Sequence, residues 1–103
     1  MIDAIDRIER YMEDIDLPSF EKDDQLQSAV LFQFIVIGEA IRHIDPMILE
    51  RHPFPWHQPR GFRNFIAHQY NLILPERVFH TTKELQDLRS VLERIQRSEF
   101  ENR

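Results

Sequence analysis

The first twenty residues combine apolar and acidic positions with a helical period. Apolar side chains recur at steps of three and four residues, at Ile2, Ile5, Ile8, Met12 and Ile15. This spacing places them on one face of an α-helix, with acidic residues between them. We expect this helix to end at Leu17, because the residue before Pro18 is disfavoured in the α conformation.

A long apolar segment follows, with the sequence AVLFQFIVIGEAIRHI. It offers almost no polar face, which is typical of a central helix packed by neighbours on several sides. Asp23 or Asp24 is expected to cap its N-terminus. A buried strand over residues 29–37 is the alternative, but the chain has no second strand-like run to pair with it. Gly38 would let another helix approach closely, since it has no side chain.

The remaining segments also favour helices. Asp45 and Pro46 predict a short helix that ends near residue 51. The segment HPFPWHQP is expected to be an extended connector, after which a helix spans residues 58–70. Pro75 opens the last helix, in which Leu85, Leu88, Leu92 and Ile95 form a packing seam. The sequence therefore predicts one all-α domain over residues 1–103, a bundle of four main helices with an additional short one.

Composition narrows the classes of function. The 103 residues include no cysteine, which excludes disulfides, thiolate metal sites and cysteine nucleophiles. Two glycines are too few for a GxGxxG phosphate loop, and the Gly-Lys pair of the Walker loop is absent. The net charge of −5 argues against non-specific coating of nucleic acid, and we expect no DNA partner. We find no signal peptide and no membrane span, so we expect a cytoplasmic protein.

Charge is distributed unevenly along the chain. Residues 1–28 hold nine acids against three bases, whereas residues 42–68 hold four arginines and four histidines against two acids. The middle third is therefore the most cationic part. Its histidines lack the spacing of a zinc site, so we expect no bound metal. Trp56, in the proline-rich connector, is expected to fill a hydrophobic pocket.

The segment RNFIAHQY carries the candidate chemistry. On an ideal helix, Arg63, Asn64 and His68 share a polar arc, with Arg63 and His68 about 140° apart, while Phe62, Phe65 and Ile66 share the opposite arc. Arginine can hold a phosphate with a planar fork, and histidine exchanges protons near neutral pH. Asn64 lies four residues before His68 and could contact it. Tyr70 would lie above Arg63, about 10 Å along the helix.

These residue types suit metal-free cleavage of a phosphodiester, in which histidine moves protons and arginine stabilises the charged phosphorane. One helix brings Arg63 and His68 together poorly, so two copies facing each other across a two-fold axis would supply a complete set. An ordinary polar helix surface is the alternative. In that case His68 is only a favourable partner of the helix dipole, and Tyr70 lies at the rim of the core.

The motif and its surroundings resemble the HepT-type toxins of the HEPN superfamily. These are small α-helical ribonucleases paired with a minimal nucleotidyltransferase antitoxin of the MntA type. The family signature is an arginine, four to six residues, a histidine, any residue and a tyrosine. It stands here as Arg63, NFIA, His68, Gln69 and Tyr70. The similarity covers about residues 1–98 and includes AVLFQFIVIGEAIRHI, ERHPFPW and GFRNFIAHQY in that order.

The resemblance implies a HEPN four-helix bundle and a metal-independent endoribonuclease toxin of a type VII system. Such a toxin acts on RNA as a homodimer, with the active cleft at the interface and without a cofactor. Arg63 and His68 match the catalytic positions, and Asn64 matches a supporting polar position. Tyr70 matches the tyrosine that the MntA-type antitoxin AMPylates to inactivate the toxin. Gln69 and Asn71 depart from the commonest form of the motif.

Two other functions remain open from the sequence. The chain could be a non-enzymatic subunit that holds a nucleotide or substrate for an associated nucleotidyltransferase, or a structural interaction module with a relic motif. Glu39 also has two interpretations. The first, which the spacing favours, is pairing with Arg42 or His43 on its own helix; the second is orienting a catalytic arginine or binding a partner.

Overall fold

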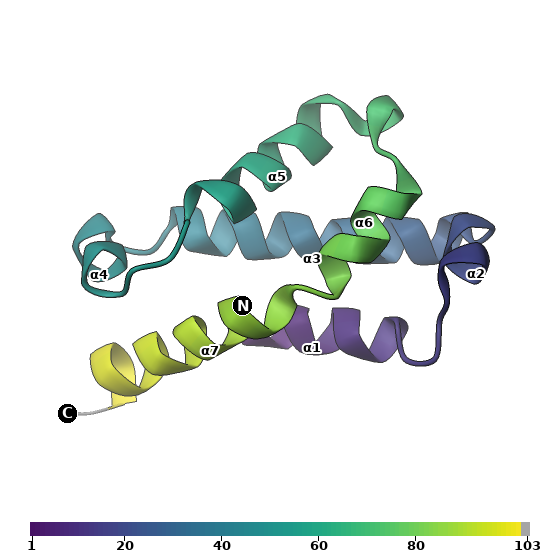
Figure 1. The fold of residues 1–103 in the computed structure, drawn as a ribbon. Coiled ribbons are helices and arrows are strands. Elements are labelled where there is room, and N and C mark those ends of the chain that lie inside the picture. The colour runs from purple at the N-terminus through teal and green to yellow at the C-terminus, as the bar shows by residue number, and fades with distance from the viewer. Residues whose placement is uncertain (102–103) are drawn as a thin grey trace.

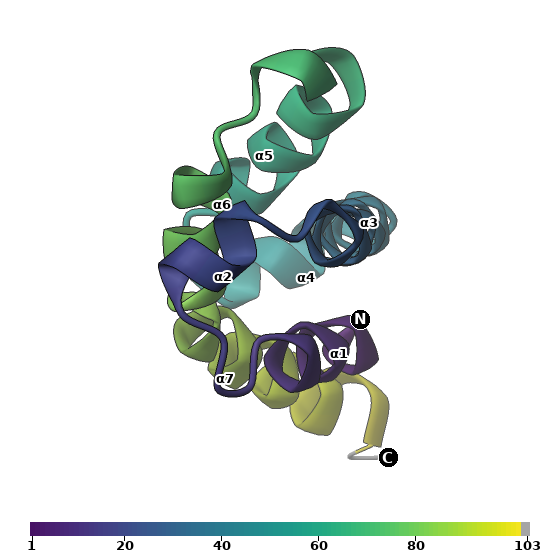
Figure 2. The same cartoon turned by 90° about the vertical axis from the view of Figure 1, so that its right-hand side faces the viewer.

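The computed structural model describes residues 1–101, and this part of the chain contains helices and no strand. The longest helix, α3 (Asp24–Arg42), runs through the middle of the molecule. Helix α5 (His57–His68) lies on one side of α3, and α1 (Ile2–Tyr11) and α7 (Leu85–Ile95) lie on the other (Figure 1 and Figure 2). The all-α prediction and the central place of the apolar helix are confirmed.

Helix α3 begins as its sequence predicts and is covered less completely than expected. The Asp23 carboxylate accepts a hydrogen bond from the Leu26 backbone N–H at 3.0 Å, so Asp23 is the cap. Val30, Ile37 and Ile41 are buried, as an all-round apolar helix requires. Phe32, however, is 59% exposed, because one face of α3 has no neighbouring helix in the single chain.

The first helix is shorter than predicted. It ends at Tyr11, and a separate helix, α2 (Leu17–Glu21), follows. Between them Asp14 adopts a φ of 60°, which reverses the chain. The Asp16 carboxylate then accepts from the Ser19 N–H at 2.9 Å and caps α2. Pro18 therefore lies in the first turn of a new helix instead of ending the old one, because the missing proline N–H does no harm there.

The last predicted helix is also two helices. Helix α6 (Pro75–Thr82) ends before Lys83, and α7 begins at Leu85. Near this break the Thr81 and Thr82 hydroxyls donate to backbone carbonyls at 2.8 and 2.6 Å, which competes with regular helix geometry. The break lets α6 pack against α2 while the predicted leucine seam of α7 packs along α1.

The interface between α1 and α7 also uses acids that an isolated amphipathic helix would leave in solvent. Asp6 forms an ion pair with Arg89, and Glu9 accepts a hydrogen bond from the Gln86 side-chain amide at 2.7 Å. Beneath these contacts Ile5 and Ile8 are fully buried. No helix in residues 1–101 has both the length and the apolar character needed to cross a bilayer.

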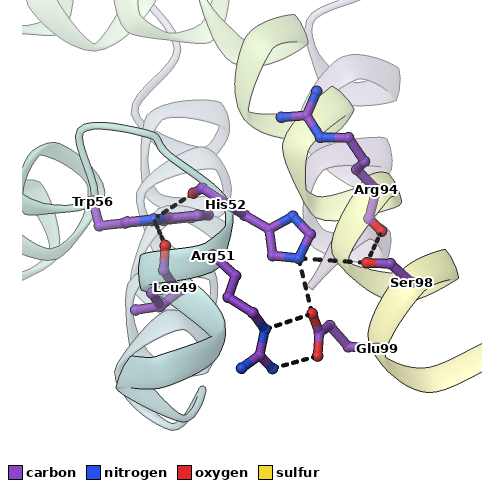
Figure 3. Close-up of polar contacts among 7 residues, drawn as sticks. All are labelled: Leu49, Arg51, His52, Trp56, Arg94, Ser98 and Glu99. Carbon is purple, nitrogen blue, oxygen red and sulfur yellow. Dashed lines mark hydrogen bonds and ion pairs between the residues drawn. The ribbon is translucent and has the colours of Figure 1, made fainter.

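The C-terminal end of the described chain is attached to the short helix α4 (Pro46–Arg51), whose N-terminus Asp45 caps as predicted. After α7 a π-helical stretch (η2, Gln96–Glu101) brings Glu99 to α4. Arg51 donates to the two Glu99 carboxylate oxygens, from Nη2 at 2.6 Å and from Nε at 3.2 Å (Figure 3). His52 Nε2 lies 3.0 Å from Glu99 Oε2 and 3.4 Å from Ser98 Oγ. We call Arg51, His52, Ser98 and Glu99 the Glu99 cluster.

The Glu99 cluster shifts a titration. Hydrogen bonds first from Arg51 and then from His52 lower the pKa of Glu99 to about 2, because they favour the ionised carboxylate.

The neighbouring connector is held by Trp56, which is buried as the sequence predicts. The Trp56 indole N–H is placed between the carbonyls of His52 and Leu49, at 3.1 and 3.3 Å (Figure 3). The connector is therefore fixed before α5 begins.

Candidate functional site

Helix α5 carries the motif and rests on α3 by its apolar side. Ile66 is buried, and the Phe62 ring meets the Phe34 ring edge-on, with centroids 5.0 Å apart. These contacts turn Arg63 toward α3 and leave Asn64 and His68 on the outer side. The sequence of α5, HQPRGFRNFIAH, contains two arginines, two histidines and no acid. The motif therefore lies on a helix whose own charges are all positive or neutral.

Arg63 packs against Gly38 and contacts Glu39. A Cβ atom at Gly38 would lie 2.3 Å from Arg63 Cβ, so the helices approach too closely there for any side chain. The Arg63 guanidinium contacts Glu39 Oε1 through Nη2 at 2.5 Å and donates from Nη1 to Asn64 Oδ1 at 3.3 Å. Arg63 Nε is buried and has no hydrogen-bond partner in the described part of the chain. We call these residues the Arg63 site.

Glu39 contacts residues of its own helix and also Arg63 of α5. The pairs that helical spacing favoured are present, with Arg42 at 3.5 Å and His43 at 3.7 Å from the carboxylate. The contact with Arg63 is about 1 Å shorter and joins two helices. Helical spacing within α3 could not rank this contact first, because it depends on how α5 is placed against α3.

His68 is the last residue of α5 and is exposed. It makes no hydrogen bond or ion pair with another residue that the structure describes. The contact with Asn64 that the four-residue spacing allowed is absent, because Asn64 turns its carbonyl oxygen toward Arg63. The Arg63 side chain contacts α3, whereas the His68 side chain is exposed.

Tyr70 lies outside the helix that was predicted to carry it. Helix α5 ends at His68, Gln69 takes a φ of −130° and a ψ of 36°, and a 3₁₀ turn follows (η1, Tyr70–Leu72). The expected position of Tyr70 above Arg63 on one continuous helix is therefore wrong. Tyr70 is instead 54% exposed, and its hydroxyl oxygen lies 3.2 Å from Ser28 Oγ on α3.

A hollow of about 610 Å³ lies between α5 and α6, and sequence analysis did not find it. Phe65 was expected to face the core with Phe62 and Ile66, yet it is 44% exposed at the rim of this hollow. Leu72 and Leu74 are more exposed still. The helical period could not reveal this, since it gives the direction of Phe65 but not whether another element covers it.

No group of three or more His, Asp or Glu side chains within the described residues is arranged to hold a metal ion. His43 and His52 follow the ends of α3 and α4, His57 begins α5, and His52 belongs to the Glu99 cluster. The polar groups available at the motif are therefore the ion-paired guanidinium of Arg63, the exposed imidazole of His68, the amide of Asn64 and the phenol of Tyr70. These groups can bind an anion and exchange protons.

The family model described as "Ribonuclease HepT-like" matches residues 1–95, nearly the whole chain. The protein belongs to the HepT-like ribonuclease family. The similarity inferred from the motif and its flanking segments is thus confirmed. In this HepT-like chain, Arg63 faces α3 and His68 is exposed to solvent.

Two relatives from Methanocaldococcus jannaschii carry ribonuclease names. "Putative RNase MJ1380" is 30% identical over 71 residues, which cover 68% of this chain and 65% of that protein, slightly under two thirds of its length. "Putative RNase MJ0125" is 29% identical over 97 residues, which cover 92% of this chain and 84% of that protein. No solved structure is significantly similar to this HepT-like chain.

Proposed function

We propose that this HepT-like protein is a metal-independent endoribonuclease and the toxin of a type VII HepT–MntA toxin–antitoxin pair. The observation that carries the proposal is the state of the two motif residues. Arg63 is held in place by Glu39 and Asn64, while His68 is exposed at the end of the same helix with no partner in the described chain. Membership of a ribonuclease family supports the same reaction.

The proposed reaction uses the ribose 2′-hydroxyl as nucleophile. Its oxygen attacks the adjacent phosphorus and its proton passes to an imidazole, while the 5′-oxygen of the next nucleotide leaves and takes a proton from an imidazolium. Arg63 would stabilise the negative charge on the pentacovalent phosphorane. The products are an RNA with a 2′,3′-cyclic phosphate and an RNA with a 5′-hydroxyl. Each step uses side-chain protons only.

The different environments of Arg63 and His68 support a homodimer as the active form. In the single chain the guanidinium is paired with Glu39 of α3, whereas the imidazole is exposed and makes no contact with it. A second α5 across a two-fold axis would place the His68 of one chain opposite the Arg63 of the other. Mixing inactive Arg63→Ala and His68→Ala chains tests this: shared sites would restore part of the activity, and complete sites within each chain would restore none.

Cleavage of a defined RNA by the purified protein tests the ribonuclease proposal. We expect the parent to cleave in the presence of EDTA and to leave 2′,3′-cyclic phosphate ends. His68→Ala should abolish cleavage with an unchanged helical circular dichroism spectrum, because its side chain is exposed. A parent that binds RNA or ATP but cuts nothing would instead be the binding subunit for a nucleotidyltransferase. Full activity of His68→Ala would contradict the mechanism.

We propose further that an MntA-type antitoxin inactivates the toxin by AMPylating Tyr70. The phenol oxygen would attack the α-phosphate of ATP, pyrophosphate would leave, and the phenolic proton would be lost to solvent. The exposure of Tyr70 makes its hydroxyl accessible to such an enzyme. The adduct would add a phosphodiester anion and an adenine ring next to the motif, where both would exclude RNA. The intact mass of the protein co-expressed with its antitoxin tests this, since Tyr70→Phe should lose every AMP increment.

A further inference from the structure

We propose that Glu39 is a positioning residue for Arg63: it fixes the guanidinium for contact with the scissile phosphate. Gly38 leaves the space that the Arg63 side chain occupies. This inference rests on the proposed ribonuclease function. Glu39 itself would touch no RNA. It would act through Arg63, by setting which N–H groups of the guanidinium remain free and in which direction they point.

The geometry of the three Glu39 ion pairs favours this role. Its pairs with Arg42 and His43 are long, at 3.5 and 3.7 Å, and those partners are 68% and 77% exposed. Exposed pairs of this kind contribute little to stability. The Arg63 pair is 2.5 Å long, and the Arg63 side chain is only 24% exposed. The short contact between helices is therefore the main interaction of the Glu39 carboxylate.

Gly38 makes the contact possible. A side chain at position 38 would overlap the stem of Arg63, with a new Cβ 2.3 Å from Arg63 Cβ and 2.7 Å from Arg63 Cγ. Both distances are far below van der Waals contact, and the added Cβ would also lie 3.2 Å from the Pro59 backbone carbonyl oxygen. Gly38 thus leaves room for the aliphatic part of the Arg63 side chain, and the next residue, Glu39, contacts its guanidinium.

The remaining hydrogen-bonding capacity of Arg63 is matched to one anion. A guanidinium has five N–H donors. Glu39 takes one on Nη2 and Asn64 takes one on Nη1, while Nε is buried without a partner in the described residues. One donor remains on each terminal nitrogen. Because the head is already oriented, these two donors need no further ordering when a phosphate arrives.

The Glu39 charge has a second consequence. Its carboxylate offsets part of the Arg63 charge, so it weakens the binding of RNA in the ground state while it orients the donor used in the transition state. Removing the carboxylate should therefore change binding and turnover in opposite directions. A residue that only maintains the fold would lower the fraction of active protein and would not tighten RNA binding.

The first experiment compares steady-state cleavage by Glu39→Ala and Glu39→Gln. We expect Glu39→Ala to lower kcat by about 100-fold, because misplacement of a catalytic group by roughly 1 Å has effects of that size. Glu39→Gln should recover a large part of kcat, since its amide oxygen can still accept from Arg63. The matched controls are Arg42→Ala and His43→Ala, which remove the other Glu39 pairs and should keep the parent kcat.

The second experiment measures RNA binding in the non-cleaving His68→Ala protein. Adding Glu39→Ala or Glu39→Gln should tighten binding roughly two- to fivefold, the range expected for one partly exposed charge pair. The gain should vanish when Arg63→Ala is also present, because Glu39 acts through Arg63. A gain that persists without Arg63 would contradict the proposal.

The outcomes separate this inference from the proposed function. If Arg63→Ala cleaves RNA as well as the parent, the ribonuclease mechanism fails. If Arg63→Ala is inactive while Glu39→Ala keeps the parent kcat, the mechanism stands and Glu39 has no positioning role. If both Glu39 variants lose their helical circular dichroism, Glu39 is a structural residue and the inference is overturned.

Discussion

Two arginine–glutamate pairs join distant parts of this chain, and they differ in how many contacts join the two side chains. In the Glu99 cluster, Arg51 contacts both oxygens of Glu99 through two nitrogens, and His52 adds a third contact to the carboxylate. In the Arg63 site, one nitrogen of Arg63 contacts one oxygen of Glu39. We call the first pair closed, because both carboxylate oxygens contact one guanidinium, and the second pair open, because only one does.

The difference separates a structural use of the same residue types from a proposed functional one. The closed pair fixes the C-terminal stretch to α4 and lowers the pKa of Glu99 to about 2. The open pair lies beside an exposed His68 that lacks a partner within the described residues. The Arg63 donors that a ligand could reach are the remaining ones on its two terminal nitrogens, because Nε is buried.

Substitution of Trp56, whose indole contacts the backbone beside the Glu99 cluster, should have the largest effect on stability. Trp56→Ala deletes a buried ring and leaves a cavity, which lowers the free energy of unfolding by about 3–5 kcal/mol. Trp56→Phe keeps an aromatic ring but loses the N–H that the His52 and Leu49 carbonyls accept, for a loss of about 1 kcal/mol. Urea unfolding measures both, and equal losses would show that the hydrogen bonds dominate.

Changing the two arginines to lysine should sharpen the comparison through activity. Arg63→Lys should lower RNA cleavage by about 100-fold or more, because an ammonium cannot contact Glu39, Asn64 and a phosphate in one plane. Arg51→Lys should leave cleavage unchanged and lower the melting temperature instead. A loss of cleavage in Arg51→Lys that exceeds its loss of folded protein would show that the closed pair also serves the reaction.

Acid should weaken the closed pair over a defined range. The folded pKa of Glu99, about 2, lies below its ordinary value of 4.5, so the unfolded chain takes up this proton first. The stabilisation is complete above pH 4.5 and is lost as the pH falls toward 2. Glu99→Gln should be less stable than the parent at pH 7 and should lose less stability between these limits.

The control for this titration is Glu50→Gln, which alters an exposed acid of the same α4 helix. Asp16, whose pKa is lowered by its hydrogen bonds with Ser19, is present in all three proteins and contributes equally to them. Denaturant unfolding at several pH values measures the difference. Parallel curves for the parent and Glu99→Gln would show that Glu99 does not carry this acid sensitivity.

The smallest effect is expected at Tyr70 in the unmodified protein. Tyr70→Phe removes an exposed hydroxyl whose recorded partner is Ser28 at 3.2 Å, so the free energy of unfolding should change by less than about 0.5 kcal/mol. Cleavage by the purified variant should match the parent, because the phenol takes no part in the proposed reaction. A large loss of cleavage would give Tyr70 a direct role in RNA contact.

Much of the fold was predictable because local rules determine it. The Asp45–Pro46 start of α4, the Asp23 cap and the irregular connector before α5 all follow from residues close in sequence. The two missed helix breaks have a different cause. At Asp14 the chain enters a positive φ, and near Lys83 two threonines bond back to the backbone. Apolar spacing continues through both places, so the period alone could not reveal them.

The candidate site also combines features that the sequence predicts with features that it does not. The motif assigned Arg63, Asn64, His68 and Tyr70 from sequence, and the helical period predicted that Arg63 and His68 lie at different angles on the helix. The Glu39–Arg63 contact, the exposure of Phe65 and the displacement of Tyr70 from the helix depend on how α5 meets α3 and α6. Tertiary placement decides such features, although Gly38 next to Glu39 was a visible signal of close approach.

Helix α5 contains no acid, so its own charges differ in sign from the net charge of residues 1–28. Nine acids lie in residues 1–28, on the far side of α3 from α5 or near its N-terminal end, whereas α5 carries Arg60 and Arg63 with two histidines. A polyanion would be repelled by the first surface and drawn to the second. For the proposed RNA substrate, this asymmetry would orient the encounter before any contact forms. Its association rate would therefore fall as added salt shortens the range of the field.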